Sequence, residues 1–198
     1  MPLGLPGADP TALRPQVGGI KRFPVFISYG EEAKDLKRRV KRLVEEAIDS
    51  QLTHDLWQIH IPVIDWREIA AQAAPRGGKT NDLFVKWAGY SSATIVLLFD
   101  RMPPGTAEEL RAAMDEGIEL KVFWIRRRRW LKALRPRTEV DRFLEQQSDD
   151  FKYLEIEDPD SEQAWIEITA NLVSVLLRVV RGQTMEPLFE TRGNPWTS

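Results

Sequence analysis

The feature that most constrains the fold of this 198-residue chain is the apolar run ATIVLLFD at residues 93–100. A nearly continuous apolar run of this length is typical of a strand that is covered on both faces. A helical pattern follows at 106–117, where apolar residues recur at intervals of three and four and Gly117 is the expected stop. A buried strand that leads directly into an amphipathic helix predicts a parallel sheet with helices packed on it.

The same alternation continues along most of the chain. Strands are predicted at 22–30, 56–65, 93–100, 120–125 and 151–157, and helices at 31–50, 81–90, 106–117, 137–148 and 161–181. Pro62 has no backbone N–H to donate, which favours an edge position for the second strand. The predicted fold is therefore α/β: a flavodoxin-like five-stranded parallel sheet in the order 2-1-3-4-5 with helices on both faces.

Composition bounds the classes of protein to which the chain can belong. Lys plus Arg number 28 against 30 for Asp plus Glu, so the charge balance gives no electrostatic argument for nucleic acid or for a membrane surface. The chain has no cysteine, which excludes disulfides, thiolate metal sites and cysteine nucleophiles. We expect no membrane span, because no continuous apolar run comes close to the roughly 18 residues that a span requires. We expect a cytoplasmic protein without membrane or nucleic-acid partners.

The domain boundaries follow from the ends of the regular pattern. Residues 1–21 are rich in Pro and Gly and are predicted to be a flexible N-terminal segment. Residues 22–181 carry all the predicted strands and helices and form one α/β domain. Residues 182–198 show no period and are predicted to be a C-terminal tail in coil conformation.

Ligands of such sheets bind at the carboxyl ends of the strands, near the point where the strand order reverses. The residues at or just after the ends of the first three predicted strands are Ser28, Tyr29, Gly30, Asp65, Trp66, Asp100 and Arg101. All seven are candidate ligand-binding residues, because parallel strands bring their carboxyl ends to one edge of the sheet.

Several of these residues also have an ordinary structural explanation. Ser28 is followed three residues later by Glu31, as in a helix cap. Trp66 can stack on a base or simply pack, while Asp65 beside it can bond a ribose hydroxyl. Arg101 can pair with a pyrophosphate or with a neighbouring carboxylate. The two interpretations stay open for each of them.

The stretch GTAEEL at 105–110 raises the same question for two glutamates. Thr106 and Glu109 have the spacing of a capping box, in which the glutamate side chain returns to the Thr106 amide. The alternative is that Glu109 is a catalytic carboxylate, with Thr106 and Glu108 close to the substrate, because this helix begins directly after the central strand. A carboxylate at that position can stabilise an oxocarbenium-like centre or attack it.

Three stretches carry a resemblance to known families: VFISYGEEAKDLKRRV, SSATIVLLFDR and GTAEELRAAMDEGIELKVFWI. Together they resemble the TIR-like and nucleoside 2-deoxyribosyltransferase-like superfamily over about residues 22–180. The pattern Glu-Leu-x-x-Ala-x-x-x-Gly of the second group is matched by Glu109, Leu110, Ala113 and Gly117. The usual SYSxxD of TIR domains is replaced by SYGEEAKD.

This resemblance implies a function. It implies an N-glycosidase that cleaves nicotinamide from NAD(P), with Glu109 as the catalytic residue, NAD(P) as substrate, no cofactor and no metal. It also implies a homo-oligomer switched on by self-association or by a protein partner, and a role as an immune or anti-phage effector. The alternatives are a deoxyribosyltransferase-like hydrolase or transferase of nucleosides and a non-catalytic module that binds a nucleotide or a protein.

Two further stretches do not identify a function. The loop RGGKT at 76–80 ends in Gly-Lys-Thr, like a phosphate-binding Walker loop. That motif also requires a glycine five residues before its Gly-Lys pair, and position 73 is alanine here. The run Arg126–Arg129 lies after the fourth strand, but a basic run is most often a solvated face.

Overall fold

A computed structural model describes residues 21–49, 59–64, 80–126, 137–147 and 153–190 of the chain. Residues 1–20 and 191–198, which cover most of the predicted flexible segment and the end of the predicted tail, lie outside this part. The first described residues, Lys21–Arg22, form the short strand β1, so regular structure begins one residue before the predicted domain boundary.

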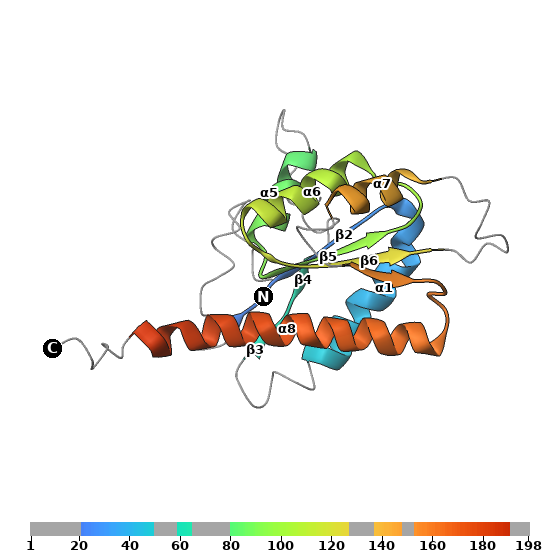
Figure 1. Cartoon of the computed structure of the whole chain (residues 1–198). Coiled ribbons are helices and arrows are strands. Elements are labelled where there is room, and N and C mark those ends of the chain that lie inside the picture. Colours follow the sequence, from blue (N-terminus) through green and yellow to red (C-terminus); the bar gives the residue numbers. More distant parts are fainter. Residues whose placement is uncertain (1–20, 50–58, 65–79, 127–136, 148–152, 191–198) are drawn as a thin grey trace.

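The main sheet has five parallel strands (Figure 1). Its order is β4 (Val63–Ile64), β2 (Val25–Tyr29), β5 (Ala93–Leu98), β6 (Glu119–Ile125) and β7 (Tyr153–Ile156). Since β4 belongs to the predicted second strand and β2 to the first, the predicted order 2-1-3-4-5 is confirmed. The point where the order reverses lies between β2 and β5.

The predicted second strand is divided at Pro62. Its first part, β3 (Ile59–His60), pairs with β1 in a separate two-stranded sheet, and its second part is β4 at the edge of the main sheet. The Asp49 carboxylate accepts a hydrogen bond from the Ile61 N–H (2.8 Å) and lies 2.9 Å from His60 Nδ1. Asp49 therefore links the strand β3 and the residue after it to the helical segment that ends at residue 49.

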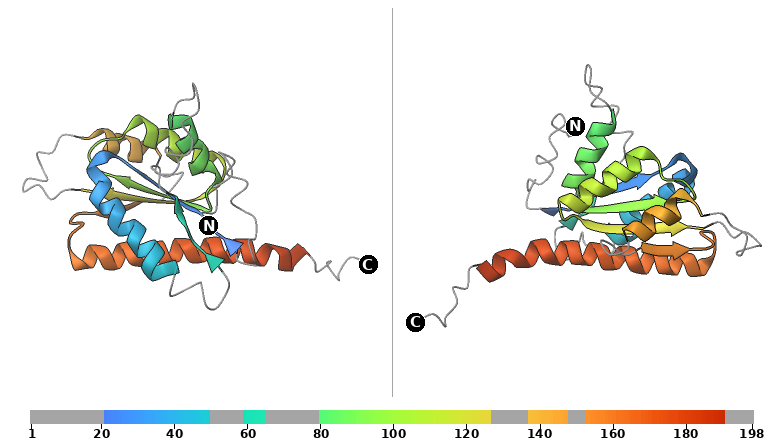
Figure 2. Two further views of the ribbon diagram at one scale, coloured as in Figure 1. Left: turned by 180° about the vertical axis from the view of Figure 1, so that it is seen from behind. Right: turned by 45° about the horizontal axis from the view of Figure 1, so that its top comes forward.

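Helices cover both faces of the sheet (Figures 1 and 2). One face carries α8 (Glu162–Glu190) and the segment 31–49, which consists of η2 (Glu31–Ala33), α1 (Lys34–Arg42) and the π-helical η3 (Leu43–Asp49). The other face carries α5 (Thr80–Tyr90), α6 (Pro104–Asp115) and α7 (Glu139–Gln146). All five predicted helices are present.

Two expectations about the last helix were wrong. It continues to Glu190, although the sequence predicted coil from residue 182. The segment Glu162–Gly182 is also long and apolar enough, by length and composition alone, to cross a membrane. However, one side of this helix packs against the sheet, and Ile168, Leu172 and Leu176 are at most 2% exposed. We therefore interpret α8 as a core helix of the α/β domain.

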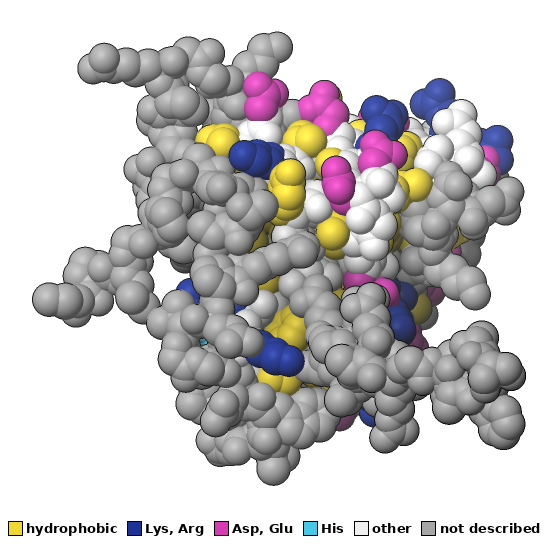
Figure 3. Space-filling view, turned by 90° about the vertical axis from the view of Figure 1, so that its left-hand side faces the viewer, with side chains coloured by type: hydrophobic (Ala, Val, Ile, Leu, Met, Phe, Trp, Pro, Cys, Tyr) yellow, Lys and Arg dark blue, Asp and Glu magenta, His cyan; other side chains and the backbone are white. Residues whose placement is uncertain are grey.

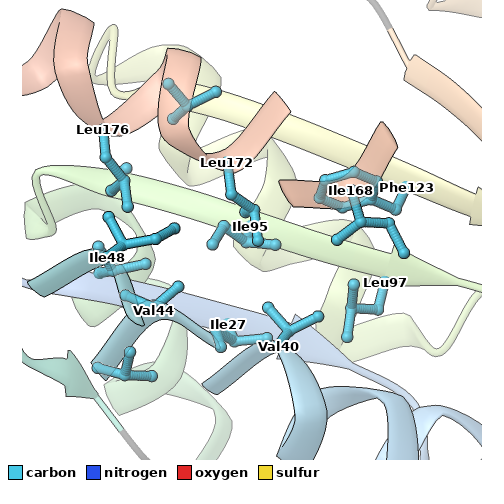
Figure 4. Packing of buried hydrophobic residues seen from close by; sticks show 14 of the residues in the cluster. Ile27, Val40, Val44, Ile48, Ile95, Leu97, Phe123, Ile168, Leu172 and Leu176 are labelled. Atoms are coloured by element: carbon cyan, nitrogen blue, oxygen red, sulfur yellow. The ribbon is translucent and has the colours of Figure 1, made fainter. Parts of the chain in front are cut away.

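The larger core lies between the sheet and the face of α1, η3 and α8 (Figure 4). Leu172 of α8 points toward Ile95 of β5 and Leu176 toward Ile48 of η3, while Val40 and Val44 approach Ile27 from the other helical segment. The second core, under α6 and α7, contains Val96, Leu98, Val122 and Trp124 from the opposite face of the same strands. β5 is thus buried on both faces, as its apolar sequence predicted.

The amino end of the sheet is the side shown in Figure 3. In the upper, described part of that side, Lys and Arg side chains alternate with Asp and Glu side chains. On this side, the described residues therefore show no large patch of one sign, in keeping with the near-neutral formal charge of −2.

Candidate active site

The strand pleat directs Ser28 toward the α6 side of the sheet. Ile27 belongs to the core with α1 and α8, whereas Phe26 packs against Trp87 and Ala88 of α5. Successive side chains of a strand alternate between faces, so Ser28 lies on the same face as Phe26. Ser28 is 1% exposed, at the carboxyl end of β2 and next to the reversal point of the sheet.

Helix α6 begins three residues earlier than the capping-box interpretation requires, since that interpretation makes Thr106 the N-cap. Its first residue is Pro104, and its N-cap, Pro103, forms no side-chain cap hydrogen bond. Proline suits the first turn of a helix because its missing N–H would have no helical partner there. Thr106 consequently lies inside the helix, where it is buried. The capping-box interpretation of Thr106 and Glu109 was wrong.

The Glu109 side chain bonds to the neighbouring strand instead. Ser28 Oγ donates a hydrogen bond to Glu109 Oε2, across a sequence separation of 81 residues. Among the described residues, Ser28 is the hydrogen-bond partner that the structure gives to this carboxyl group. Glu109 is 7% exposed, which is low for a residue type that is seldom fully buried.

Burial changes the acidity of this carboxyl group. It raises the pKa of Glu109 from its ordinary value of 4.5 to about 7; the Ser28 hydrogen bond opposes this rise, and the neighbouring charge of Glu108 adds to it. Water stabilises a carboxylate more than a dry site does, so burial favours the protonated form. Near neutral pH the group is therefore divided between its two protonation states.

The pair opens into a pocket of about 270 Å³. Its lining combines apolar side chains with the polar end of β2: Phe26, Ile27, Ser28, Tyr29, Glu31, Phe84 and Glu109. The pocket lies where the predicted fold places ligands, at the carboxyl end of β2 beside the reversal point. A mostly apolar wall with a few convergent polar groups is the usual composition of a small-molecule site.

The other predicted site residues are distributed around this pocket. Gly30 lies in the next turn, where a Cβ atom would approach Pro103 Cγ to 3.0 Å. Asp100 is half-buried after β5, while Arg101 and Glu108 are exposed, and none of these three lines the pocket. The remaining two, Asp65 and Trp66, lie outside the described residues.

Arg126, at the end of β6, has a structural role. Its guanidinium donates to Glu155 (2.7 Å) and Asp141 (3.2 Å) and lies 4.2 Å from the centre of the Trp124 ring. These contacts join β6, β7 and α7. The rest of the run Arg126–Arg129 lies outside the described residues.

Sequence reasoning missed the aromatic wall of the pocket. Phe84 comes from α5, and Phe26 lies two residues before Ser28 on β2. The alternation of β2 was enough to place Phe26 beside Ser28. No short-range signal connects Phe84 to the site, because α5 reaches it only through the packing of the fold.

Comparison with known proteins supports the fold and not a family. No family model matches this sequence, and comparison with curated proteins gives no match. Similar solved structures include the flavodoxin-like domain from a Synechococcus sp. protein, which is 10% identical with a TM-score of 0.45, over 79% of this chain and 99% of that one. The fold is flavodoxin-like.

Two further structures similar to this chain are flavoproteins by name. The flavodiiron core from Synechocystis sp. is 9% identical with a TM-score of 0.48, over 80% of this chain and 36% of that one. A diflavin flavoprotein from Nostoc sp. is 11% identical with a TM-score of 0.44, over 83% of this chain and 97% of that one. At this level of identity the likeness concerns the fold alone.

These neighbours contradict the expectation that the protein uses no cofactor, and that expectation is withdrawn. They do not assign a flavin to this chain. The turn after β2 carries Glu31 and Glu32 at the helix start, and Glu31 lines the pocket. A phosphate group requires hydrogen-bond donors or positive charge at such a turn. The two carboxylates at this helix start therefore disfavour a flavin phosphate there, although Lys34 pairs with Glu31 at the same turn.

Proposed function

We propose that the protein cleaves the N-glycosidic bond between nicotinamide and ribose in NAD(P), with Glu109 as the catalytic carboxylate. The observation that carries this proposal is the buried Ser28–Glu109 pair in a pocket at the reversal point of the sheet. Its position agrees with the resemblance of GTAEEL to the catalytic segment of TIR-like and deoxyribosyltransferase-like proteins. The resemblance itself stays a prediction.

The pocket suits one half of a dinucleotide. Its volume of about 270 Å³ lies just below the range of roughly 300–1,000 Å³ typical of sites for drug-sized ligands. The nicotinamide ring and its ribose match that volume better than the whole dinucleotide does. Phe26 and Phe84 supply an apolar wall for the ring, and Glu109 supplies the charge for the sugar.

In the proposed reaction the bond between ribose C1′ and the pyridinium nitrogen breaks, and its electron pair leaves with neutral nicotinamide. Positive charge develops on C1′ and the ring oxygen, as in other glycoside hydrolyses. Ionised Glu109 stabilises that charge, which an apolar pocket makes more effective than bulk water would. Water then adds to C1′ and releases one proton, giving ADP-ribose from NAD.

We propose further that the protein acts in the cytoplasm as a homo-oligomer, activated by self-association or by a protein partner. These features come from the resemblance. A concentration series of the purified protein tests them, because an enzyme activated by self-association gains activity faster than in proportion to its concentration.

The function is tested by measuring nicotinamide release from NAD and NADP by the purified full-length protein at high concentration. We expect release by the wild type and a loss of at least about 100-fold on Glu109→Gln, since the amide cannot stabilise positive charge. Glu116→Gln is a matched control, because Glu116 is an exposed glutamate at the opposite end of the same helix. It should retain full activity.

Other outcomes of this test favour the alternatives. Consumption of nucleosides but not of NAD(P), with the same dependence on Glu109, would replace the proposed substrate by that of a deoxyribosyltransferase-like enzyme. Saturable binding of NAD without any bond cleavage would support a nucleotide-binding module. Equal activity of the wild type and Glu109→Gln would refute the role given to this carboxylate.

A further inference from the structure

Ser28 has a different role in the structure from the one that its sequence position suggests. It follows a run of apolar residues at the strand end where ligands bind, which favoured direct contact with the substrate. Yet its hydroxyl is directed at Glu109, and the side chain is 1% exposed. A hydroxyl has one hydrogen to donate, and here the carboxylate receives it.

We propose that Ser28 is a positioning residue, whose hydroxyl holds Glu109 Oε2 against the end of β2 so that Oε1 is directed at the ligand. This inference rests on the proposed function. A carboxylate that accepts a hydrogen bond on one oxygen keeps the other oxygen available for a developing positive charge. The single Ser28 contact therefore fixes one of the two oxygens and thereby the plane of the group.

The backbone brings the two residues within reach. Gly30 follows Ser28 by two residues, and a Cβ atom there would come to 3.0 Å from Pro103 Cγ, just before α6. The absence of that Cβ allows the turn after β2 to lie close to the start of α6. Glu109 is in the second turn of α6, so this close approach sets the separation that the Ser28 hydroxyl spans.

The same contact affects the ionisation of Glu109. Among the described residues, the titratable groups around it are Tyr29 and Glu31 near Ser28 and Glu108 on its own helix, and α5 contributes Phe84 to the pocket lining. Loss of the hydroxyl removes a donor that favours the charged form. The ionisation midpoint of Glu109 should then move upward by about one pH unit, since a hydrogen bond to a charged group has roughly that effect.

The experiment is a carbon NMR titration of the full-length protein with labelled glutamate carboxyl groups, in which the Glu109 signal is assigned by its absence from Glu109→Gln. We expect Ser28→Ala to raise the Glu109 midpoint by about one pH unit and Ser28→Thr, which keeps the hydroxyl, to stay within a few tenths of the wild type. Ser28→Cys keeps a side chain of similar size whose S–H group donates only weakly, so this variant should shift the midpoint as Ser28→Ala does. It serves as the test if Ser28→Ala does not fold.

Kinetics then separate positioning from substrate binding. Ser28→Ala should lower kcat for nicotinamide release with little change in KM, and Ser28→Thr should restore it. An unchanged midpoint in both Ser28→Ala and Ser28→Cys would overturn the proposal, as would a raised KM with unchanged kcat. A shifted midpoint in a protein that cleaves no substrate would show that Ser28 holds Glu109 while the proposed function fails.

Discussion

At the scale of single residues, the proposed function depends on the carboxyl group of Glu109, which is buried where its charged form is disfavoured. Glu109 could be solvated on the surface of α6, as Glu108 is, yet it is buried against Ser28. The sequence indicated Glu109 through its position after the central strand. It did not indicate Ser28 as its partner, because a contact between residues 81 positions apart leaves no local pattern.

Burial of Glu109 should make the stability of the folded protein depend on pH. Its pKa is raised in the folded state to about 7 from 4.5, so the folded protein binds more protons than the unfolded chain between these values. Stability from this group is fully present below about pH 4.5 and is lost as pH rises to about 7, by roughly 3 kcal/mol in all.

Glu109→Gln removes the loss of stability at high pH, because glutamine does not ionise. The variant should be more stable than the wild type by up to roughly 3 kcal/mol at pH 8 and nearly equal to it at pH 4.5. Urea unfolding at the two pH values measures the difference. Equal stability of the two proteins at pH 8 would show that the folded protein does not disfavour the Glu109 charge.

At the scale of helices and strands, periodicity predicted the sheet order because the apolar runs were long and their spacing distinct. It failed where a single proline or a long-range contact decides the structure. Pro62 ends β3 and separates it from β4, and Pro104 starts α6 two residues before the capping pattern of Thr106. In each case the backbone restriction of proline outweighed the side-chain pattern.

The predicted stop of α6 at Gly117 is confirmed and can be tested. Gly117 has φ +65°, its N–H donates to the Met114 carbonyl (3.0 Å), and the Ile118 N–H donates to the Ala113 carbonyl (2.8 Å). This is a Schellman ending, whose left-handed residue costs a side chain about 1 kcal/mol. Gly117→Ala should lower the free energy of unfolding by that amount in a urea titration.

The control for this prediction is another glycine of the same layer of helices. Gly89 is buried in α5, with no left-handed φ, and a Cβ there would meet the flexible Glu116 side chain at 3.2 Å. Gly89→Ala therefore tests local crowding without backbone strain. A loss on Gly117→Ala no larger than that on Gly89→Ala would contradict the importance of the turn conformation.

At the scale of the whole molecule, the two faces of the sheet have separate tasks. The face covered by α1, η3 and α8 holds the larger apolar core, and the Ser28–Glu109 pair lies on the opposite face, with a pocket that reaches Ile27 and Tyr29 at the carboxyl end of β2. Both faces share the central strands of the sheet, whose side chains point alternately to one face and to the other. Stability and site chemistry should therefore respond to different substitutions.

Leu172→Ala tests this separation. Leu172 is fully buried on α8, so its truncation should lower the free energy of unfolding by about 3 kcal/mol through lost burial and a cavity. Ile166→Ala on the same helix should change it by less than about 0.5 kcal/mol, since Ile166 is 56% exposed. Urea unfolding gives both values.

Neither α8 variant should move the ionisation midpoint of Glu109, because α8 lies on the other face of the sheet. A midpoint that shifted in Leu172→Ala while the protein remained folded would show that the two faces are coupled.

The central claim is that ionised Glu109 cleaves the bond to nicotinamide. The most direct test is the rate of nicotinamide release from NAD well below its KM, which reports kcat/KM, between pH 5 and 9 for the wild type and Glu109→Gln. With a pKa of about 7, the wild-type rate should be about tenfold lower at pH 6 than on its plateau above pH 8, and the variant should be inactive throughout. A wild-type rate that is independent of pH, or a variant that retains it, would contradict the account.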